Sequence, residues 1–230
     1  MGKNLIQQRR GRGVSLTYTS PGHRFRGQAE LPREEGTVAD LINCPGHSSP
    51  LMILEGKEGL AIAPEGIRIG DQISIGERSE IKKGNVLQLK DIPEGTTVYN
   101  IENNPGDGGR FVRACGTFAK IVAKTANTVV IKLPSKKEKT FHPNCRAAIG
   151  IVAGSGRSEK PLLKAGTMYH KMRARNKLYP SVSGTSMNAV DHPFGGSCSH
   201  SKGKPTIAPK NAPPGRKVGK LRPRRTGKKK

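Results

Sequence analysis

Short apolar runs rich in Val, Ile and Leu, separated by glycine and proline, occupy the centre of the chain between residues 31 and 156. Residues 67–75 alternate apolar and polar positions, as a half-buried strand does. The spacing of the runs is typical of small β-barrels. The pattern therefore predicts an all-β centre made of two small barrels, each marginally stable alone. The expected strands are residues 37–43, 51–55, 60–63, 67–75, 86–89, 97–101, 117–124, 128–133 and 148–152.

Helical spacing occurs in residues 163–177, after the predicted barrels. Apolar side chains can form one stripe along this segment while basic side chains point elsewhere. The stripe would consist of Leu163, Met168, Tyr169 and Met172. Prolines recur between residues 180 and 223 and prevent a long helix there. We therefore expect one short helix followed by an extended path.

Positive charge is concentrated at the two ends of the chain. The 230 residues include 41 Lys and Arg against 17 Asp and Glu, a formal net charge of +24. Residues 1–30 carry +5, residues 31–156 only +2, and residues 157–230 carry +17. Leu, Ile, Val and Phe make up 33 of the 126 central residues but 9 of the last 74, too few for that end to fold alone. The sequence predicts a nearly neutral centre between two basic arms that are solvated or ordered by something else.

A charge of this size indicates a polyanionic partner. In both arms Arg and Lys stand beside Gly and Pro, where the backbone can approach phosphates and Arg can bind them bidentately. The last arm offers only Tyr169, Tyr179 and Phe194 for stacking on bases. Recognition of folded RNA by shape and phosphate is therefore favoured over base reading. The alternatives are a solvated tail that aids solubility or targeting, and an architectural protein that binds DNA or RNA.

Two groups of side chains could suggest chemistry, but neither has the required arrangement. Ser186, Asp191 and His192 lack the second glycine of a nucleophile elbow, and the Asp adjoins the His. The Cys/His pairs within residues 44–47 and 198–200 lack the paired spacing of a zinc site. No complete nucleotide-binding glycine loop occurs. We expect no enzyme, catalytic residue, metal or cofactor, and keep a hydrolase or RNA-processing enzyme using Ser186 or His192 as the rival hypothesis.

Cysteine usage and hydropathy bear on the compartment. The four cysteines lie far apart with no CxxC pair, which suits reduced thiols in a cytosol. No stretch approaches the roughly 18 consecutive apolar residues of a membrane span, and the N-terminus has no apolar signal region. We therefore expect a soluble cytoplasmic protein.

A family resemblance is carried by residues 187–196, MNAVDHPFGG. They resemble the universal large-subunit ribosomal protein two, the L-two family, and the resemblance runs along nearly the whole chain. The short N-terminus and the PFGG form are similar to the archaeal and eukaryotic branch, and the short C-terminus favours archaea. The other matching segments are residues 8–13, 23–24, 84–87, 92–96, 104–107, 160–166, 169–171, 212–219 and 224–227.

The resemblance implies an OB-fold barrel followed by an SH3-like barrel, with terminal extensions that thread into large-subunit rRNA. The family is a primary rRNA binder linked to subunit association, tRNA binding and organisation of the peptidyl-transferase region. Its partners are rRNA, neighbouring ribosomal proteins, the small subunit and tRNA. Bacterial relatives carry a histidine where this chain has Phe194, which cannot transfer protons, so any chemistry would belong to RNA. The expected domains are a basic arm at 1–27, the OB fold at 28–82, the SH3-like barrel at 83–160 and a basic rRNA-binding extension at 161–230.

The expected RNA-binding residues lie in the two arms, at the exit from the second barrel and in the loop around the resemblance motif. They are Arg9, Arg10, Arg12, His23, Arg24, Arg26, Arg157, Lys160, Lys164, His170, Lys171, Arg173, Arg175, Lys177, Asn188, Asp191, His192, Phe194, His200, Lys202, Lys204, Lys210, Arg216, Lys217, Arg222, Arg224 and Arg225.

Overall fold

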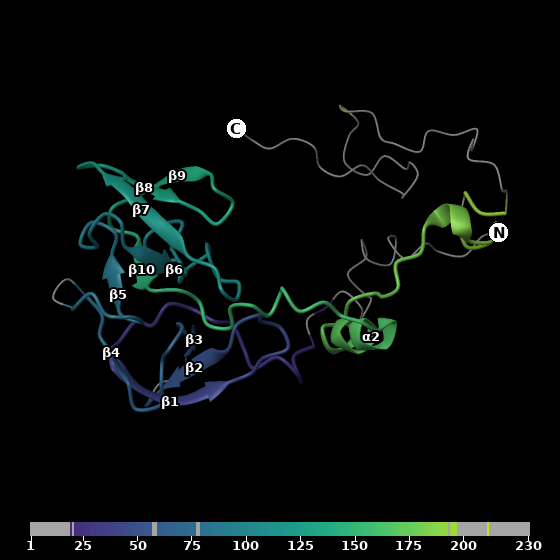
Figure 1. Cartoon of the computed structure of the whole chain (residues 1–230), viewed down its shortest axis with the longest axis horizontal. Helices are drawn as coiled ribbons and strands as arrows, with labels where there is room; N and C mark the ends of the chain where they lie inside the picture. Colours follow the sequence, from purple (N-terminus) through teal and green to yellow (C-terminus); the bar gives the residue numbers. More distant parts are fainter. Residues whose placement is uncertain are drawn as a thin grey trace. The chain divides into compact units, whose positions relative to one another are not determined.

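The computed structural model describes residues 19, 21–56, 59–76, 79–192, 194–196 and 211 (Figure 1). Two compact units divide the chain. One is Gly22–Leu163, which contains all the described strands, and the other combines Met1–Pro21 with Lys164–Lys230. The described part of the second unit contains the helix α2 (Ala165–Ala174) and the short 3₁₀ turn η2 (Gly184–Ser186).

The first sheet of Gly22–Leu163 has four antiparallel strands in the order β3-β2-β1-β4. These are β1 (Gly36–Ile42), β2 (Leu51–Leu54), β3 (Leu60–Ile62) and β4 (Gln72–Ile73). Val38 lies opposite Leu54 in the register, and both are buried with Met52 and Ile73 in one apolar cluster. Leu51 and Met52 are adjacent in β2, both are buried and they belong to different apolar clusters, so β2 is covered on both faces.

The second sheet has six antiparallel strands in the order β5-β10-β6-β7-β8-β9. These are β5 (Val86–Gln88), β6 (Thr97–Tyr99), β7 (Ala119–Lys124), β8 (Val129–Lys132), β9 (Glu138–Phe141) and β10 (Arg146–Ile149). Val98, Ala119, Ile121 and Ile131 lie on its inner face and are almost fully buried. Because the polar residues between them face outward, the sheet closes over its own apolar core.

A third apolar cluster joins the two sheets. It combines Leu51 and Ile62 of the first sheet with Val86, Tyr99 and Ala148 of the second. The Tyr99 hydroxyl, fully buried, donates a hydrogen bond to the Ile62 carbonyl across 3.2 Å. This burial raises the pKa of Tyr99 far above its ordinary value. Each small sheet therefore gains stability from the other, as its size requires.

The architecture confirms the all-β prediction, and it is that of an OB-fold barrel followed by an SH3-like barrel with a single short helix among the described residues. The strand expected at 67–75 is wrong over most of its length, since only β4 forms there. Asp71 accepts a hydrogen bond from the Arg68 backbone N–H at 2.8 Å, and Gly70 has φ +92°, so the chain turns instead. Strand β9 was not predicted, because Lys and Glu fill it and only Phe141 is buried.

Three cysteines are described, and all are free thiols: Cys44, Cys115 and Cys145. Burial raises the pKa of the Cys145 thiol. Over the described ranges, the structure contains no helix with the length and apolar character of a membrane span.

Candidate nucleic-acid interface

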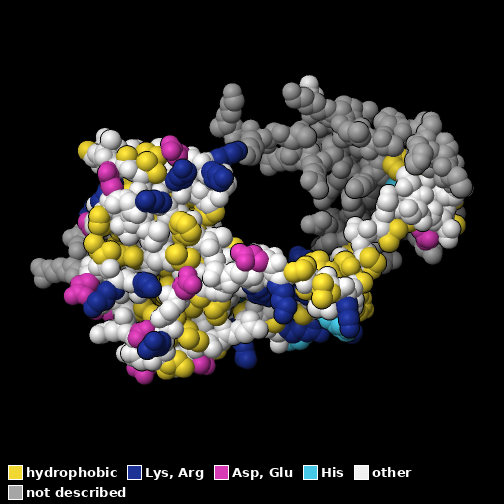
Figure 2. Space-filling model, viewed as in Figure 1, with side chains coloured by type: hydrophobic (Ala, Val, Ile, Leu, Met, Phe, Trp, Pro, Cys, Tyr) yellow, Lys and Arg dark blue, Asp and Glu magenta, His cyan; other side chains and the backbone are white. Residues whose placement is uncertain are grey.

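Helix α2 is a basic helix without an apolar face packed into a core. None of its residues is buried, its last turn carries Lys171 and Arg173, and it contains no Asp or Glu. The predicted apolar stripe is present in sequence but not buried: Tyr169 is 45% exposed, and Met168 and Met172 are only partly covered. Most helices in proteins are stabilised by burial of one face. This helix therefore has a surface suited to a partner, and Figure 2 shows its Lys, Arg and His side chains gathered over it.

The C-terminal end of α2 is fixed by backbone hydrogen bonds. The Asn176 N–H donates to the Arg173 carbonyl at 3.1 Å and the Lys177 N–H donates to the Met172 carbonyl at 2.8 Å. Asn176 has φ +50°, the left-handed conformation that closes this type of helix end. Its side-chain amide also donates to the Thr19 carbonyl at 3.2 Å. The basic side chains of residues 171–177 therefore extend from a backbone that hydrogen bonds hold in place.

The cations at this end also act on the helix itself. Lys171 and Arg173 stand where the helix dipole favours positive charge. They would be favourable there without any ligand. All six predicted residues of segment 164–177 are accessible to a partner to some degree: Lys164, His170, Lys171, Arg173 and Lys177 are exposed, and Arg175 is partly buried.

The loop at 184–196 is compact, with glycines at its closest approaches. A Cβ on Gly184 would lie 2.3 Å from His192 Cε1, and one on Gly195 would lie 2.3 Å from the Asn188 carbonyl oxygen. The Asn188 carbonyl also accepts from the N–H groups of Asp191 and His192, at 3.0 and 3.2 Å. No side chain other than hydrogen fits at these two glycines without movement of the loop.

His192 and Phe194 lie inside this loop. Both are 8% exposed, and their rings lie 5.2 Å apart between centroids. The Phe194 backbone N–H donates to His192 Nδ1 at 3.1 Å, so this nitrogen carries no proton. Burial lowers the pKa of His192, which favours the neutral form of the imidazole. Both side chains therefore pack within the loop, and their predicted contact with RNA stays a prediction.

The hydrolase hypothesis finds no geometric support in this loop. Ser186 is exposed, and no hydrogen bond joins it to His192 among the described residues. A nucleophile needs such a contact with its base. Nor does the described part of the chain contain a cluster of three or more metal-ligand side chains. The Cys198/His200 pair lies outside the described residues.

The barrel unit carries five more of the predicted residues. His23, Arg24, Arg26, Arg157 and Lys160 are all exposed. The Arg157 guanidinium donates to the Ser48 carbonyl, which holds its side chain against the first barrel. No side-chain contact of Lys160 is described.

The remaining predicted residues lie outside the described residues. They are Arg9, Arg10, Arg12, His200, Lys202, Lys204, Lys210, Arg216, Lys217, Arg222, Arg224 and Arg225.

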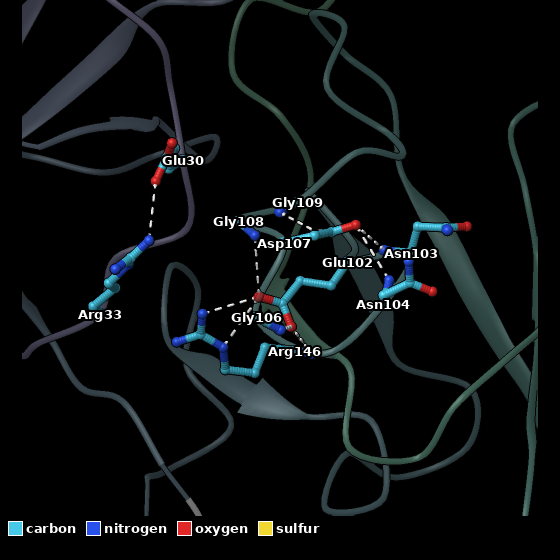
Figure 3. A network of polar contacts seen from close by, with 10 residues as sticks. All are labelled: Glu30, Arg33, Glu102, Asn103, Asn104, Gly106, Asp107, Gly108, Gly109 and Arg146. Carbon is cyan, nitrogen blue, oxygen red and sulfur yellow. Dashed lines mark hydrogen bonds and ion pairs between the residues drawn. The ribbon is translucent and has the colours of Figure 1, made fainter.

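A buried polar network in the second barrel was missed by sequence reasoning (Figure 3). Glu102 is 0% exposed; its carboxylate accepts from the Gly106 N–H at 3.1 Å and from the Arg146 N–H and guanidinium, each at 2.9 Å. Asp107 accepts from the N–H groups of Asn103 and Gly109 at 3.0 Å each. Burial alone would raise the pKa of Asp107, but these backbone donors lower it. The network shapes the loop at 103–109 and satisfies its own charges, so it is structural.

Comparisons with known proteins agree with the geometry. Residues 82–214 match the family model described as Ribosomal Proteins L2, C-terminal domain. The chain is 50% identical over 240 residues to the large ribosomal subunit protein uL2 of Methanocaldococcus jannaschii, with 99% of each chain covered. It is 48% identical over 237 residues to the protein of the same name from Methanococcoides burtonii, covering 99% of this chain and 100% of that one. For Haloarcula marismortui the identity is 47% over 236 residues, covering 99% and 98%.

Proposed function

This chain belongs to the uL2 family of large ribosomal subunit proteins, of the archaeal type, and we propose that it binds large-subunit rRNA directly through its basic segments. Membership in the family makes it a structural protein of the large subunit.

One observation carries this proposal: α2 exposes cations and buries nothing. A ten-residue helix with no buried side chain has little stabilisation of its own. Phosphates placed against Lys171, Arg173 and Lys177 would add charge-assisted hydrogen bonds. A polyanion that lies along α2 would add to the favourable interaction that Lys171 and Arg173 already make with the helix dipole.

The mechanism is electrostatic and steric. Lys and Arg of the arms neutralise phosphates where rRNA helices approach one another, and release of counterions supplies much of the affinity. The barrels fix where the arms enter the RNA. In this proposal the chain divides into a basic arm at 1–27, barrels at 28–82 and 83–160, and a basic extension at 161–230.

The same reasoning extends to the remaining partners. In a cytoplasmic ribosome the chain would lie beside other ribosomal proteins. Its rRNA contacts would support subunit association, tRNA binding and the organisation of the peptidyl-transferase region. The buried ring of Phe194 fits a supporting role, since phenylalanine has no proton to transfer and His192 is occupied by a backbone N–H. Any reaction at that place would be carried out by RNA.

Competition tests this proposal. Full-length chain bound to a labelled large-subunit rRNA fragment is challenged with unlabelled rRNA or with duplex DNA of equal length at one ionic strength. A binder of folded RNA is displaced by rRNA at far lower concentration than by DNA. Equal displacement by the two competitors would instead indicate a general architectural nucleic-acid-binding protein and would overturn the proposal.

A further inference from the structure

Two exposed lysines lie directly opposite each other on the six-stranded sheet. Across β6, β7, β8 and β9 the register places Thr97 beside Lys120, Lys120 beside Lys132, and Lys132 beside Glu138. Like charges at directly opposed positions destabilise a sheet. Glu138 offers a single carboxylate to this row, and no ion pair within 4.0 Å joins either lysine to a described carboxylate. The row therefore carries uncompensated positive charge in a part of the chain whose overall charge is nearly neutral.

A third lysine of the same region occupies an unfavourable backbone position. Lys136, in the turn between β8 and β9, has φ +64°, and the turn is closed by its N–H to the Leu133 carbonyl at 2.8 Å. Glycine is the usual residue at such a position because it has no Cβ. Lys136 is exposed. A second local cost thus occurs at a lysine in the turn that joins β8 to β9.

Exposed apolar side chains accompany these lysines. Phe118, two residues before Lys120, is 45% exposed, and Val122, two residues after it, is 44% exposed. Figure 2 shows Lys and Arg side chains, with some Asp and Glu side chains, interspersed with hydrophobic ones over β7, β8 and β9. Phosphates make no favourable contact with exposed apolar side chains, whereas an unpaired base can stack on an aromatic ring.

We propose that the outer face of β7–β9 binds an unpaired RNA segment, with its phosphates at Lys120, Lys132 and Lys136 and a base against Phe118. This inference rests on the proposed function, because it takes rRNA as the source of the segment. It adds a contact in the barrel unit, separate from the basic arms. The arms recognise phosphate and shape, while this face accepts nucleotides whose bases are free to stack. The repulsion between the opposed lysines and the strain in the turn lower the stability of the free protein, and binding of phosphate offsets this loss.

The double variant Lys120→Gln/Lys132→Gln separates this role from a merely structural one. In the free full-length protein, removing the repulsion raises the melting temperature. In binding to a uridine-rich single-stranded RNA, the slope of log K against log salt becomes flatter by about 1.4, since each of two lost phosphate contacts contributes about 0.7. A structural role would move stability and affinity in the same direction. The matched control is Lys82→Gln/Lys83→Gln, which removes the same charge from exposed lysines elsewhere in the same unit and keeps the wild-type slope.

Ultraviolet crosslinking locates the contact within the full chain. Crosslinking of the wild-type complex, followed by mass spectrometry, should place a nucleotide on the peptide that contains Phe118, and Phe118→Leu should lose that crosslink while keeping its melting temperature. The inference is overturned if Lys120→Gln/Lys132→Gln leaves the slope of log K against log salt unchanged and no crosslink forms at Phe118. If an acidic peptide then binds this face, its partner is a protein. If Lys171→Gln/Arg173→Gln still flattens the slope in that case, the proposed function stands without this second surface.

Discussion

Glu102 and Arg146 form a buried ion pair in which the guanidinium Nη2 donates to carboxylate Oε1 across 2.9 Å. The glutamate side chain is 0% exposed and the arginine side chain 22% exposed. The same carboxylate accepts backbone N–H groups from the loop at 106–108 and from Arg146 itself. The Glu102 side chain therefore holds the start of β10 against a loop that is distant in sequence.

Loss of this pair should unfold the second barrel readily. Arg146→Ala leaves the Glu102 carboxylate buried with backbone donors only, and removing one partner of a buried pair costs about 3–5 kcal/mol of unfolding free energy. Urea denaturation followed by circular dichroism measures the loss. Lys82→Ala, which breaks the exposed pair of Lys82 with Glu80, is the control and should leave the midpoint unchanged. Equal midpoints for the two variants would contradict the structural role of Glu102.

Two glycines of the same loop should respond differently to substitution. Gly106 and Gly109 have φ of +83° and +92°, so alanine is strained at both by about 1–2 kcal/mol. A Cβ on Gly109 would also lie 2.4 Å from Asn100 Oδ1, whereas nothing lies within 4 Å of one on Gly106. Gly109→Ala should therefore lower the unfolding free energy clearly more than Gly106→Ala does. The prediction fails if chemical denaturation gives the same loss for both.

The alternation of apolar residues was sufficient to predict an all-β protein, and helical spacing was sufficient to predict a short helix within residues 163–177. The contact of this helix with nucleic acid stays a prediction. Burial of Glu102 could not be predicted, because its partner Arg146 is 44 residues away and only the closed sheet brings them together. Phe141 is a single apolar residue in a charged run, so β9 becomes a strand only by pairing with β8. The lysines of β7–β9 were missed because net charge over a long segment conceals a local row. Sequence periodicity predicted the apolar stripe of α2, but whether that stripe is buried depends on tertiary contacts, which periodicity does not predict.

The loop at 184–196 should loosen in acid. Burial lowers the pKa of His192 below its ordinary value of 6.5. As the pH falls through about 6.5, the unfolded loop therefore binds a proton before the folded loop does, and stability present above this pH is lost below it. Protonation also removes the acceptor for the Phe194 N–H. Hydrogen exchange at the Phe194 amide should accelerate, beyond its intrinsic pH dependence, as the pH falls below 6.5. His192→Gln should abolish this additional acceleration. If the amide of the wild-type protein stays protected in acid, the buried, neutral state of His192 is contradicted.

The turn between β8 and β9 should become more stable with glycine. Lys136 has φ +64°, and replacement by glycine removes a conformational strain of about 1 kcal/mol. Lys137→Gly is the matched control, since Lys137 has no positive φ and glycine there only loosens the chain. Thermal unfolding should therefore show a higher midpoint for Lys136→Gly and a lower one for Lys137→Gly. A drop in both midpoints would show that the left-handed conformation of Lys136 is not strained.

The salt dependence of binding to large-subunit rRNA tests most directly whether the basic segments neutralise phosphates. With about ten phosphates contacted, log K should fall against log salt with a slope of about −7 to −9. Lys171→Gln/Arg173→Gln should flatten the slope by about 1.4–1.8 and leave the circular dichroism of the barrels unchanged. Tight binding whose strength does not change with salt, or a double variant with the wild-type slope, would contradict the account.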